Sequence, residues 1–393
     1  MEASIIIPSY NSMERLYYNL ISLNEQNYPF DKFEVIVINN GSTDYTSEML
    51  KHFRANYPLE VISIPKNKGI SHGRNQGISK AKGRILIFHD SDMIATKDFV
   101  RGHIEAHTEN NLVVCGLFWK RIYSYYYRSF DSNQQEMLQK IWKLKPASFY
   151  KMKDKTSLLS KKEIMENRFL NYTFDLDNLI VNSLKEKMNI YKEELTEYVF
   201  PWRFFLTNNS SVARKKVLEI GMFDENNQNW GFEDIDLAYR LYENDCKFKM
   251  KQDIVNVHQE HPFKYSLAQY SKSLDYMFEK YNKIENLDML LILLLITTST
   301  IPPVKPVLDE EELDALYLEW KEMLADKEYH SYLNLLKELM HILQKKHKGV
   351  ENKKKITIMK LQLDSLYHQK EKWEKELKKP IFTHTLFALK QLL

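Results

Sequence analysis

Short apolar runs alternate with helix-like segments over the first hundred residues. The apolar runs at residues 35–38 and 85–88 are continuous rather than alternating, which predicts strands that are covered on both faces, as in a parallel sheet. Strands are expected at residues 4–10, 33–40, 59–65 and 84–90, and helices at 12–26, 42–53 and 70–81. Ser42 or Thr43 is expected to open the second helix, and Gly83 to end the third. Strands separated by helices predict βαβ units and a parallel sheet.

The rest of the chain changes character twice. Residues 120–200 are rich in Tyr, Lys and Leu and predict a mostly helical insertion. Strand and loop patterns return over residues 204–261, and the pattern after them is helical to the end. We therefore expect an α/β domain over residues 1–262, with the insertion at 120–200, and an all-helical C-terminal region over 263–393.

The C-terminal region combines amphipathic and strongly apolar segments. Residues 309–345 and 351–379 are amphipathic and densely charged, with Gly349 between them, which predicts helices that pack on the α/β domain, on a second copy of the chain or on a partner protein. The most apolar stretch, residues 289–296, is too short to span a bilayer. We expect it to form a buried helix, with contact to a membrane surface as the alternative.

Composition and charge narrow the possible functions. The chain carries 56 basic and 53 acidic residues, a net charge of +3, which gives no electrostatic case for nucleic acid as the main partner. The first residues resemble a strand rather than a signal peptide, and the two cysteines, Cys115 and Cys246, do not suggest a disulfide framework. We expect a cytoplasmic protein, with peripheral contact at the inner face of the membrane as an alternative.

Two aspartates follow the fourth predicted strand. Residues 85–88 are apolar, and Asp90 and Asp92 come directly after them with Ser91 in between. Side chains two apart on a strand point the same way, so these carboxylates could converge, and their repulsion becomes useful if Mg²⁺ or Mn²⁺ lies between them. Ligands also bind beyond the carboxyl ends of parallel strands. The alternative is a polar loop with two solvated aspartates.

A second acidic cluster opens a predicted helix at residues 229–249. Glu233, Asp234 and Asp236 lie in its first turn, where the helix dipole favours acids without any functional reason. Trp230 and Phe232 flank Gly231 just before them. Such a loop can place carboxylates over a sugar, because aromatic faces pack on the apolar faces of sugar rings.

Several motifs together resemble a known family. IIIPSYN, VINNGSTD, NKGISHGRNQGI and DSD occur in the order found in family 2 glycosyltransferases, which have a GT-A fold. FFLTNNSSVARKKVLEIGMFDE and WGFEDIDLAYRL resemble the second half of that fold, especially in β-1,4-galactosyltransferase-like and chondroitin-polymerase-like members. The resemblance covers residues 4–115 and 204–262. It implies an inverting, metal-dependent transfer from a nucleotide sugar, most often a UDP-sugar, to a saccharide of the cell surface or capsule.

The resemblance assigns the metal and donor sites. Asp92 is implied as a ligand of Mn²⁺ or Mg²⁺, Asp90 as a contact of the donor ribose or the metal, and His258 as a further metal ligand, with His261 as the weaker neighbouring candidate. The residues implied to contact the donor nucleotide are Pro8, Tyr10, Asn11, Asn40, Asp44, Lys68, Gly69, Arg74, Asp90 and Ser91. The family often has Asp-Asp where this chain has Asn39 and Asn40, which leaves the donor base open. Arg74 has a surface helix position as its alternative.

The resemblance also assigns the catalytic and acceptor groups. Asp234 is implied as the base that removes the acceptor proton, and Glu233 as an acceptor contact. The residues implied to contact the acceptor or a sugar are Trp230, Gly231, Asn209 and Ser211. Tyrosines within residues 123–127 offer a further platform for a saccharide or peptide, and packing inside the insertion is their alternative role.

Other classes fit less well. Strand one is followed by PSYNSMERL, which lacks the glycine-rich loop of a sugar nucleotidyltransferase, and no G-x-G-x-x-G motif of a Rossmann dehydrogenase occurs. A HAD-type phosphatase would carry its Asp pair after strand one. A peptide or protein acceptor is the runner-up to a saccharide, and a catalytically inactive scaffold is the lesser alternative.

Overall fold

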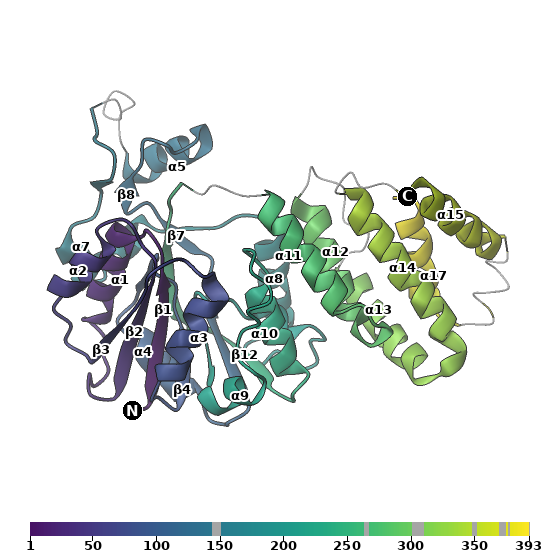
Figure 1. Ribbon diagram of the computed structural model, residues 1–393, viewed down its shortest axis with the longest axis horizontal. Coiled ribbons are helices and arrows are strands. Elements are labelled where there is room, and N and C mark those ends of the chain that lie inside the picture. Colours follow the sequence, from purple (N-terminus) through teal and green to yellow (C-terminus); the bar gives the residue numbers. More distant parts are fainter. Residues whose placement is uncertain are drawn as a thin grey trace. The chain divides into compact units, whose positions relative to one another are not determined.

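The computed structural model describes residues 1–143, 151–262, 267–300, 310–347, 352–368, 375 and 378–392 (Figure 1). The chain divides into two compact units, Met1–Leu267 and Ala268–Leu393. The strands, all in the first unit, are β1 (Ala3–Ser9), β2 (Phe33–Asn40), β3 (Leu59–Ile64), β4 (Ile85–Phe88), β5 (Met93–Ala95), β6 (Leu112–Leu117), β7 (Lys120–Ile122), β8 (Tyr125–Tyr126), β9 (Thr156–Ser157), β10 (Phe174–Asp175), β11 (Ser210–Ala213) and β12 (Lys247–Gln259).

The helices fall into two sets. Those of the first unit are α1 (Met13–Leu23), α2 (Thr46–His52), α3 (Ile70–Lys80), α4 (Phe99–Ala106), α5 (Ser132–Trp142), α7 (Lys161–Met165), α8 (Leu179–Tyr191), α9 (Arg214–Glu219) and α10 (Glu233–Tyr242), with 3-10 turns at Arg168–Tyr172 and Pro201–Phe204. The later helices are α11 (Leu267–Lys280), α12 (Leu287–Thr300), α13 (Glu310–Ala325), α14 (His330–His347), α15 (Lys353–Tyr367) and α17 (Pro380–Lys390), with 3-10 turns at Ile284–Asn286 and Lys327–Tyr329.

A mixed, mostly parallel sheet forms the centre of the first unit. Its strand order is β10-β7-β12-β6-β11-β4-β1-β2-β3, and β5 pairs with β12 beside this path. The neighbours β4, β1, β2 and β3 are parallel, while β11 runs antiparallel between β4 and β6. The parallel strands β1, β2, β4 and β12 therefore end at the same edge of the sheet, where polar loops follow them.

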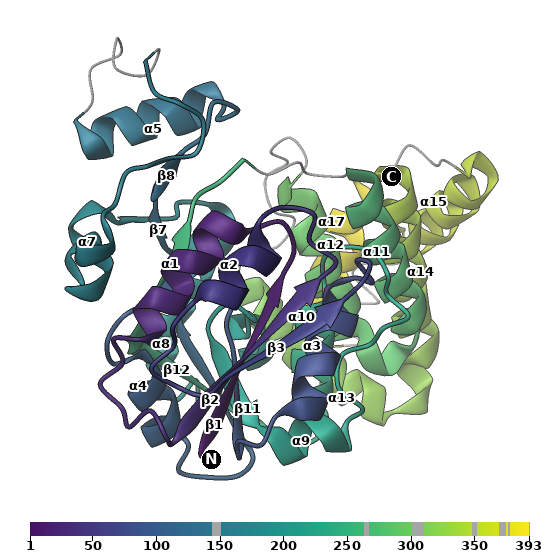
Figure 2. The same ribbon diagram turned by 60° about the vertical axis from the view of Figure 1, so that its left-hand side comes forward.

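Helices cover both faces of this sheet (Figure 2). Apolar side chains of α1, α2 and α4 share one core cluster with alternate residues of β1, β2 and β4, such as Ile5 and Val35. Helix α3 lies on the opposite face, because a Cβ at Gly77 would come within 2.9 Å of Ile6 and Ile38, which point that way. Alternation along β2 and β4 thus explains their continuous apolar runs, since both faces of these strands are buried.

The sequence pattern placed the first four strands correctly and erred at several boundaries. Helix α2 begins at Thr46 rather than at Ser42 or Thr43, and α3 ends at Lys80, before Gly83. Gly83 instead lies against the backbone of β1, where a Cβ would be 2.3 Å from the Ala3 carbonyl carbon. The insertion at 120–200 holds α5, α7 and α8 but also the short strands β7 to β10, which we did not expect.

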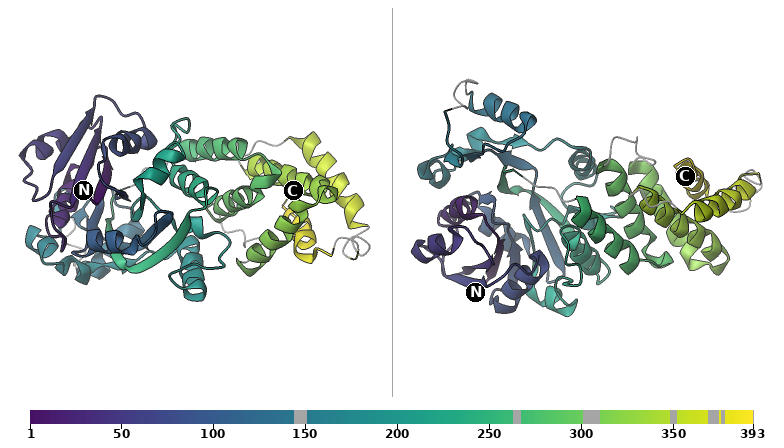
Figure 3. Two further views of the ribbon diagram at one scale, coloured as in Figure 1. Left: turned by 90° about the horizontal axis from the view of Figure 1, so that it is seen from below. Right: turned by 45° about the horizontal axis from the view of Figure 1, so that its top comes forward.

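The second unit is helical throughout its described residues. Helix α14 contacts α12, α13 and α17, and α15 contacts α17 (Figure 3). The apolar stretch at 289–296 lies in α12, and its residues Met289, Leu290 and Leu293 are buried, so the expected buried helix is confirmed. Among the described residues, no helix is long and apolar enough to cross a membrane. Gly349 lies outside the described residues, and contact with a membrane or partner stays a prediction.

Candidate functional site

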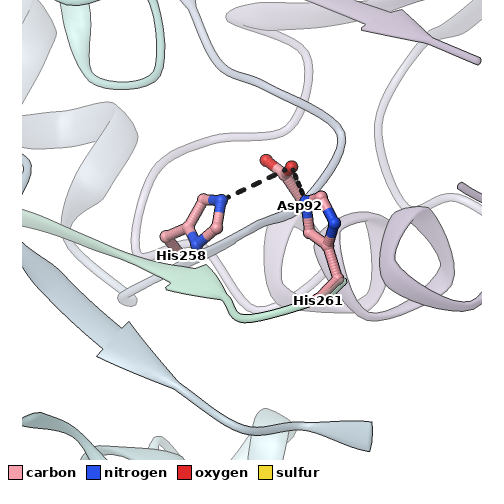
Figure 4. A group of neighbouring side chains, drawn as sticks. All are labelled: Asp92, His258 and His261. Carbon is pink, nitrogen blue, oxygen red and sulfur yellow. Dashed lines mark hydrogen bonds and ion pairs between the residues drawn. The ribbon is translucent and has the colours of Figure 1, made fainter. Parts of the chain in front are cut away.

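Asp92, His258 and His261 form a candidate metal site at the carboxyl edge of the sheet. One ligand atom from each residue lies within 4.8 Å of the other two (Figure 4). Asp92 Oδ2 is 3.6 Å from His258 Nε2 and 3.1 Å from His261 Nε2. The backbone fixes this meeting, because β5 pairs with β12 and the N–H of Gln259 donates to the Asp92 carbonyl at 2.8 Å.

The charges in this group suit a divalent cation. Burial alone would raise the pKa of Asp92, but His258 and His261 hold it well below its usual value. Burial would likewise lower the pKa of His258, and Asp92 and Glu260 raise it above its usual value. A carboxylate oxygen and two imidazole nitrogens are a ligand set that Mn²⁺ accepts, so the residues present fit the implied metal.

Asp90 lies outside this group, which corrects the expectation that Asp90 and Asp92 converge on one ion. The strand ends at Phe88, and the following residues form a turn in which the N–H of Met93 donates to the Asp90 carbonyl at 3.1 Å. Strand alternation therefore does not continue through the aspartates. The Asp90 carboxylate accepts from Arg74 Nη2 at 2.9 Å instead, while Ser91 is buried and accepts from the Ser12 hydroxyl at 3.0 Å.

Arg74 connects the two acidic motifs. Arg74 is only 1% exposed, so the surface alternative for this residue is wrong. Arg74 Nη1 donates to Glu233 Oε1 at 2.8 Å, and Nη2 donates to Asp90 and to the Thr207 hydroxyl, the latter at 2.6 Å. Burial would lower the pKa of Arg74, but Asp90 and Glu233 raise it above its usual value. One guanidinium thus holds the turn after β4 against the start of α10.

Asp234 lies in the first turn of α10, behind a loop with an unusual backbone. Gly231 has φ +101° and Phe232 has φ +68°, and the left-handed region is rare for a bulky residue such as Phe. These two residues turn the chain so that the helix starts directly at Glu233. Burial and the Glu233 carboxylate raise the pKa of Asp234 to about 7. A carboxylate with this pKa can take a proton at neutral pH.

The loops assigned to the nucleotide meet at the same edge. The Asn11 side-chain oxygen accepts from the N–H groups of Thr43 and Asp44, and Asp44 accepts from the N–H of Met13 at the start of α1. Pro8 is buried at the end of β1, whereas the Tyr10 side chain is 50% exposed. The loop after β1 and the loop after β2 therefore support one another and leave Tyr10 accessible.

Asn40 holds the loop that carries Lys68 and Gly69. The buried Asn40 amide donates to the Gly69 carbonyl at 2.9 Å, and its oxygen accepts from the N–H of Lys68 at 3.1 Å. Lys68 itself is exposed, and Gly69 has φ +90° with open space where a Cβ would point. An aspartate at position 40 could not donate to Gly69, which gives a structural reason for the departure from the family's usual Asp.

Two residues assigned to the acceptor lie inside the domain, and this corrects their assignment. Asn209 is 1% exposed and donates to the carbonyls of Leu117 and Ile254, while the Ser211 hydroxyl is buried between His103 and His107. An acceptor cannot reach either side chain. The burial of both residues follows from the central position of β11, between β4 and β6, because Ser211 lies in this strand and Asn209 directly precedes it.

The aromatic candidates divide in the same way. Trp230 is 41% exposed beside Gly231, and its contact with a sugar stays a prediction. The tyrosines of residues 123–127 are buried in the core cluster that includes Ile122 and Phe130. They therefore pack inside the insertion, and the prediction that they form a platform for a saccharide or peptide is wrong.

Three residues that contact the site were missed. The Thr207 hydroxyl accepts a hydrogen bond from Arg74, which also binds Asp90 and Glu233. Glu260 accepts from His258 at 3.0 Å, and Arg121 lies 3.7 Å from Glu260. The acidic residue between two histidines in residues 258–261 was a usable signal for Glu260. No local pattern marks Thr207 or Arg121, because their partners are far away in the sequence.

Comparison with known proteins gives the family. A profile described as glycosyl transferase family 2 matches residues 4–164. The uncharacterized glycosyltransferase YfnE of Bacillus subtilis (strain 168) is 42% identical over 394 residues, 99% of this chain and 96% of that protein. The chondroitin synthase of Escherichia coli is 27% identical over 265 residues, which span 66% of this chain and only 35% of that protein.

Among solved structures, S. aureus TarS 1-349 in complex with UDP-GlcNAc aligns over 100% of this chain and 92% of its own, with 15% identity and a TM-score of 0.49. The assignment rests on the Bacillus relative, which matches from end to end, and on the family profile. The chain belongs to the family 2 glycosyltransferases, and its first unit is an α/β domain of GT-A type.

Proposed function

We propose that this glycosyltransferase is an inverting, metal-dependent enzyme that moves a sugar from a UDP-sugar to a saccharide acceptor of a cell-surface or capsular glycan. The observation that carries the proposal is the double ion pair of Arg74 with Asp90 and Glu233. It links the turn that holds Asp92 to the helix start that holds Asp234. A donor-side metal group and an acceptor-side base are therefore supported by the same buried cation.

Asp92, His258 and His261 would hold the metal ion. When bound, a divalent ion supplies positive charge that stabilises the departing diphosphate. The two imidazoles favour Mn²⁺ over Mg²⁺, because Mg²⁺ prefers oxygen ligands in regular octahedral geometry. The remaining chemistry belongs to the side chains of the chain itself.

Asp234 is the proposed base. The acceptor hydroxyl oxygen forms a bond to the anomeric carbon, the bond from that carbon to the diphosphate breaks, and Asp234 takes the hydroxyl proton. Attack opposite the diphosphate inverts the anomeric centre. A positioned base contributes about 10²–10⁴-fold in rate. Glu233, anchored to Arg74 through Oε1, has a buried second oxygen, Oε2, without a hydrogen-bond partner in the part of the chain that the structure describes, which supports its role as a sugar contact.

The donor and acceptor are proposed from the loops at the sheet edge and from the relatives. The loops that hold Asn11, Asp44 and Asn40 are the proposed nucleotide contacts, and UDP is the usual donor nucleotide implied by the family. The Escherichia coli relative is named a chondroitin synthase, and chondroitin is a polysaccharide, which supports a saccharide acceptor. A peptide or protein acceptor is the second candidate, and an inactive scaffold the third.

Calorimetry with UDP, GDP and CDP, each in Mn²⁺ and then in EDTA, tests this proposal. Metal-dependent binding of UDP alone supports the donor loops and the metal group together. Selective binding of GDP or CDP redirects the donor and keeps the family. If no nucleotide binds, the result favours the catalytically inactive scaffold. Asp92→Ala is expected to weaken metal-dependent UDP binding, and unchanged affinity would remove Asp92 from the metal site.

A further inference from the structure

We infer that Glu260 is a positioning residue that aims His258 at the metal, and that strand β7 of the insertion supports Glu260 through Arg121. This inference rests on the metal site proposed above. It gives the insertion at 120–200 a part in the metal site, apart from any contact that it makes with an acceptor.

The orientation of His258 follows from its two nitrogens. A carboxylate can only accept, so the contact of 3.0 Å between Glu260 Oε1 and His258 Nδ1 requires that Nδ1 donates. The other nitrogen, Nε2, then faces Asp92 Oδ2 at 3.6 Å. Hydrogen bonding of one imidazole nitrogen fixes both the ring orientation and the nitrogen left for a metal.

His261 shows the same arrangement with a different partner. Its Nδ1 is 3.2 Å from the carbonyl oxygen of Pro262, and its Nε2 is 3.1 Å from Asp92 Oδ2. Both histidines thus present Nε2 to one carboxylate oxygen, and each has an acceptor behind Nδ1. The acceptor of His261 is backbone, whereas that of His258 is a side chain and can be changed by mutation.

Strand β7 fixes Glu260 in turn. The N–H of Glu260 donates to the Ile122 carbonyl at 2.7 Å, and Arg121 is the register partner of His258 in the parallel pairing of β7 with β12. Arg121 Nε lies 3.7 Å from Glu260 Oε1 and has no hydrogen-bond partner among the described residues. The guanidinium therefore balances the charge of the carboxylate that holds His258.

Titration of the full chain with Mn²⁺ alone, without nucleotide, tests this role by calorimetry. Glu260→Ala is expected to weaken Mn²⁺ binding by about 10–100-fold, the usual effect of removing a partner behind a metal-binding histidine. Glu260→Gln keeps an oxygen that accepts from Nδ1 but loses the charge, so a smaller but measurable loss of about three- to tenfold is expected. Glu48→Ala, which removes the exposed partner of His52, is the matched control and should leave Mn²⁺ binding unchanged.

A double variant distinguishes an action through His258 from a direct one. In the His258→Ala background, Glu260→Ala should cost little further affinity. An equal loss in both backgrounds overturns the inference, as does wild-type affinity in both Glu260 variants, or in Glu260→Gln alone if the Ala variant does not fold. If Asp92→Ala and His258→Ala also bind Mn²⁺ like the wild type, the proposed metal site itself fails.

Discussion

Arg74 is a buried cation with two carboxylate partners, so its removal should be costly. Arg74→Met leaves Asp90 and Glu233 without a counter-charge, and breaking a buried ion pair on one side typically destabilises by about 3–5 kcal/mol. Arg101→Met, which removes an exposed pair with Asp98, should cost less than about 1 kcal/mol. Urea unfolding of both variants measures the loss in the free energy of unfolding. Equal losses would show that the buried ion pairs of Arg74 stabilise the fold no more than an exposed pair does.

Asp234 is expected to control transfer without controlling donor binding. Asp234→Asn should abolish transfer and leave UDP binding nearly intact, because the amide cannot take a proton. In the wild type, kcat/KM should rise with pH through about 7, where the carboxylate loses its proton, and then level off. Initial rates from pH 5 to 9 and calorimetry check both parts. Loss of donor binding in the variant would contradict the assignment.

The same residue predicts a change of stability with pH. The pKa of Asp234 in the folded chain, about 7, is raised above the ordinary value of 3.8, so the folded state holds the proton more tightly. The stability from this residue is full below the ordinary value and is lost as pH rises through about 7. The Tm of Asp234→Asn relative to the wild type should therefore be higher at pH 8 than at pH 4.

At the residue scale, the sequence identified which residues carry the chemistry better than it identified which residues those side chains contact. The order of Asp90, Asp92, Glu233 and Asp234 could be recognised, but the turn that separates the two aspartates could not. Ser211 resembled an acceptor contact because its motif matches the family, while its burial depends on a strand that pairs with distant neighbours. Burial of a polar residue by long-range pairing leaves no local pattern.

The loop after β3 depends on one side chain of β2. Asn40→Asp replaces the donor to the Gly69 carbonyl with a second acceptor, so we expect a loss of about 1–3 kcal/mol and faster amide hydrogen exchange at residues 67–69. Asn56→Asp, at an exposed loop position, should stay within about 0.5 kcal/mol. Protected amides at 67–69 in Asn40→Asp would show that another contact holds the loop.

Elements were predictable where their periodicity was long enough. The first four strands carry short apolar runs between helical segments, of four residues in β2 and β4 and of fewer in β1 and β3, and each was found. Strands β8, β9 and β10 have two residues each, and a pattern of period two cannot be read from two positions. They exist because of their partners, as in the pairing of Phe174 with Arg121.

The two units each have their own core, which predicts that they can be separated. We propose that residues 1–262 are the transferase domain and that 263–393 form a distinct helical region. A fragment of residues 1–267 should fold, unfold cooperatively and bind UDP with Mn²⁺ like the full chain. Circular dichroism and calorimetry test it, with the full chain as control. A fragment that aggregates or does not bind would show that the helical region is needed for the fold.

The pairing of β7 with β12 sets a limit on grafting between relatives. Exchanging the insertion between family members would test whether it sets acceptor preference. A junction placed before residue 120 would also replace Arg121, which lies beside Glu260, and the Ser124 hydroxyl, which donates to Gln259. A chimera should therefore keep the recipient's residues 120–124 and begin the donor segment after them.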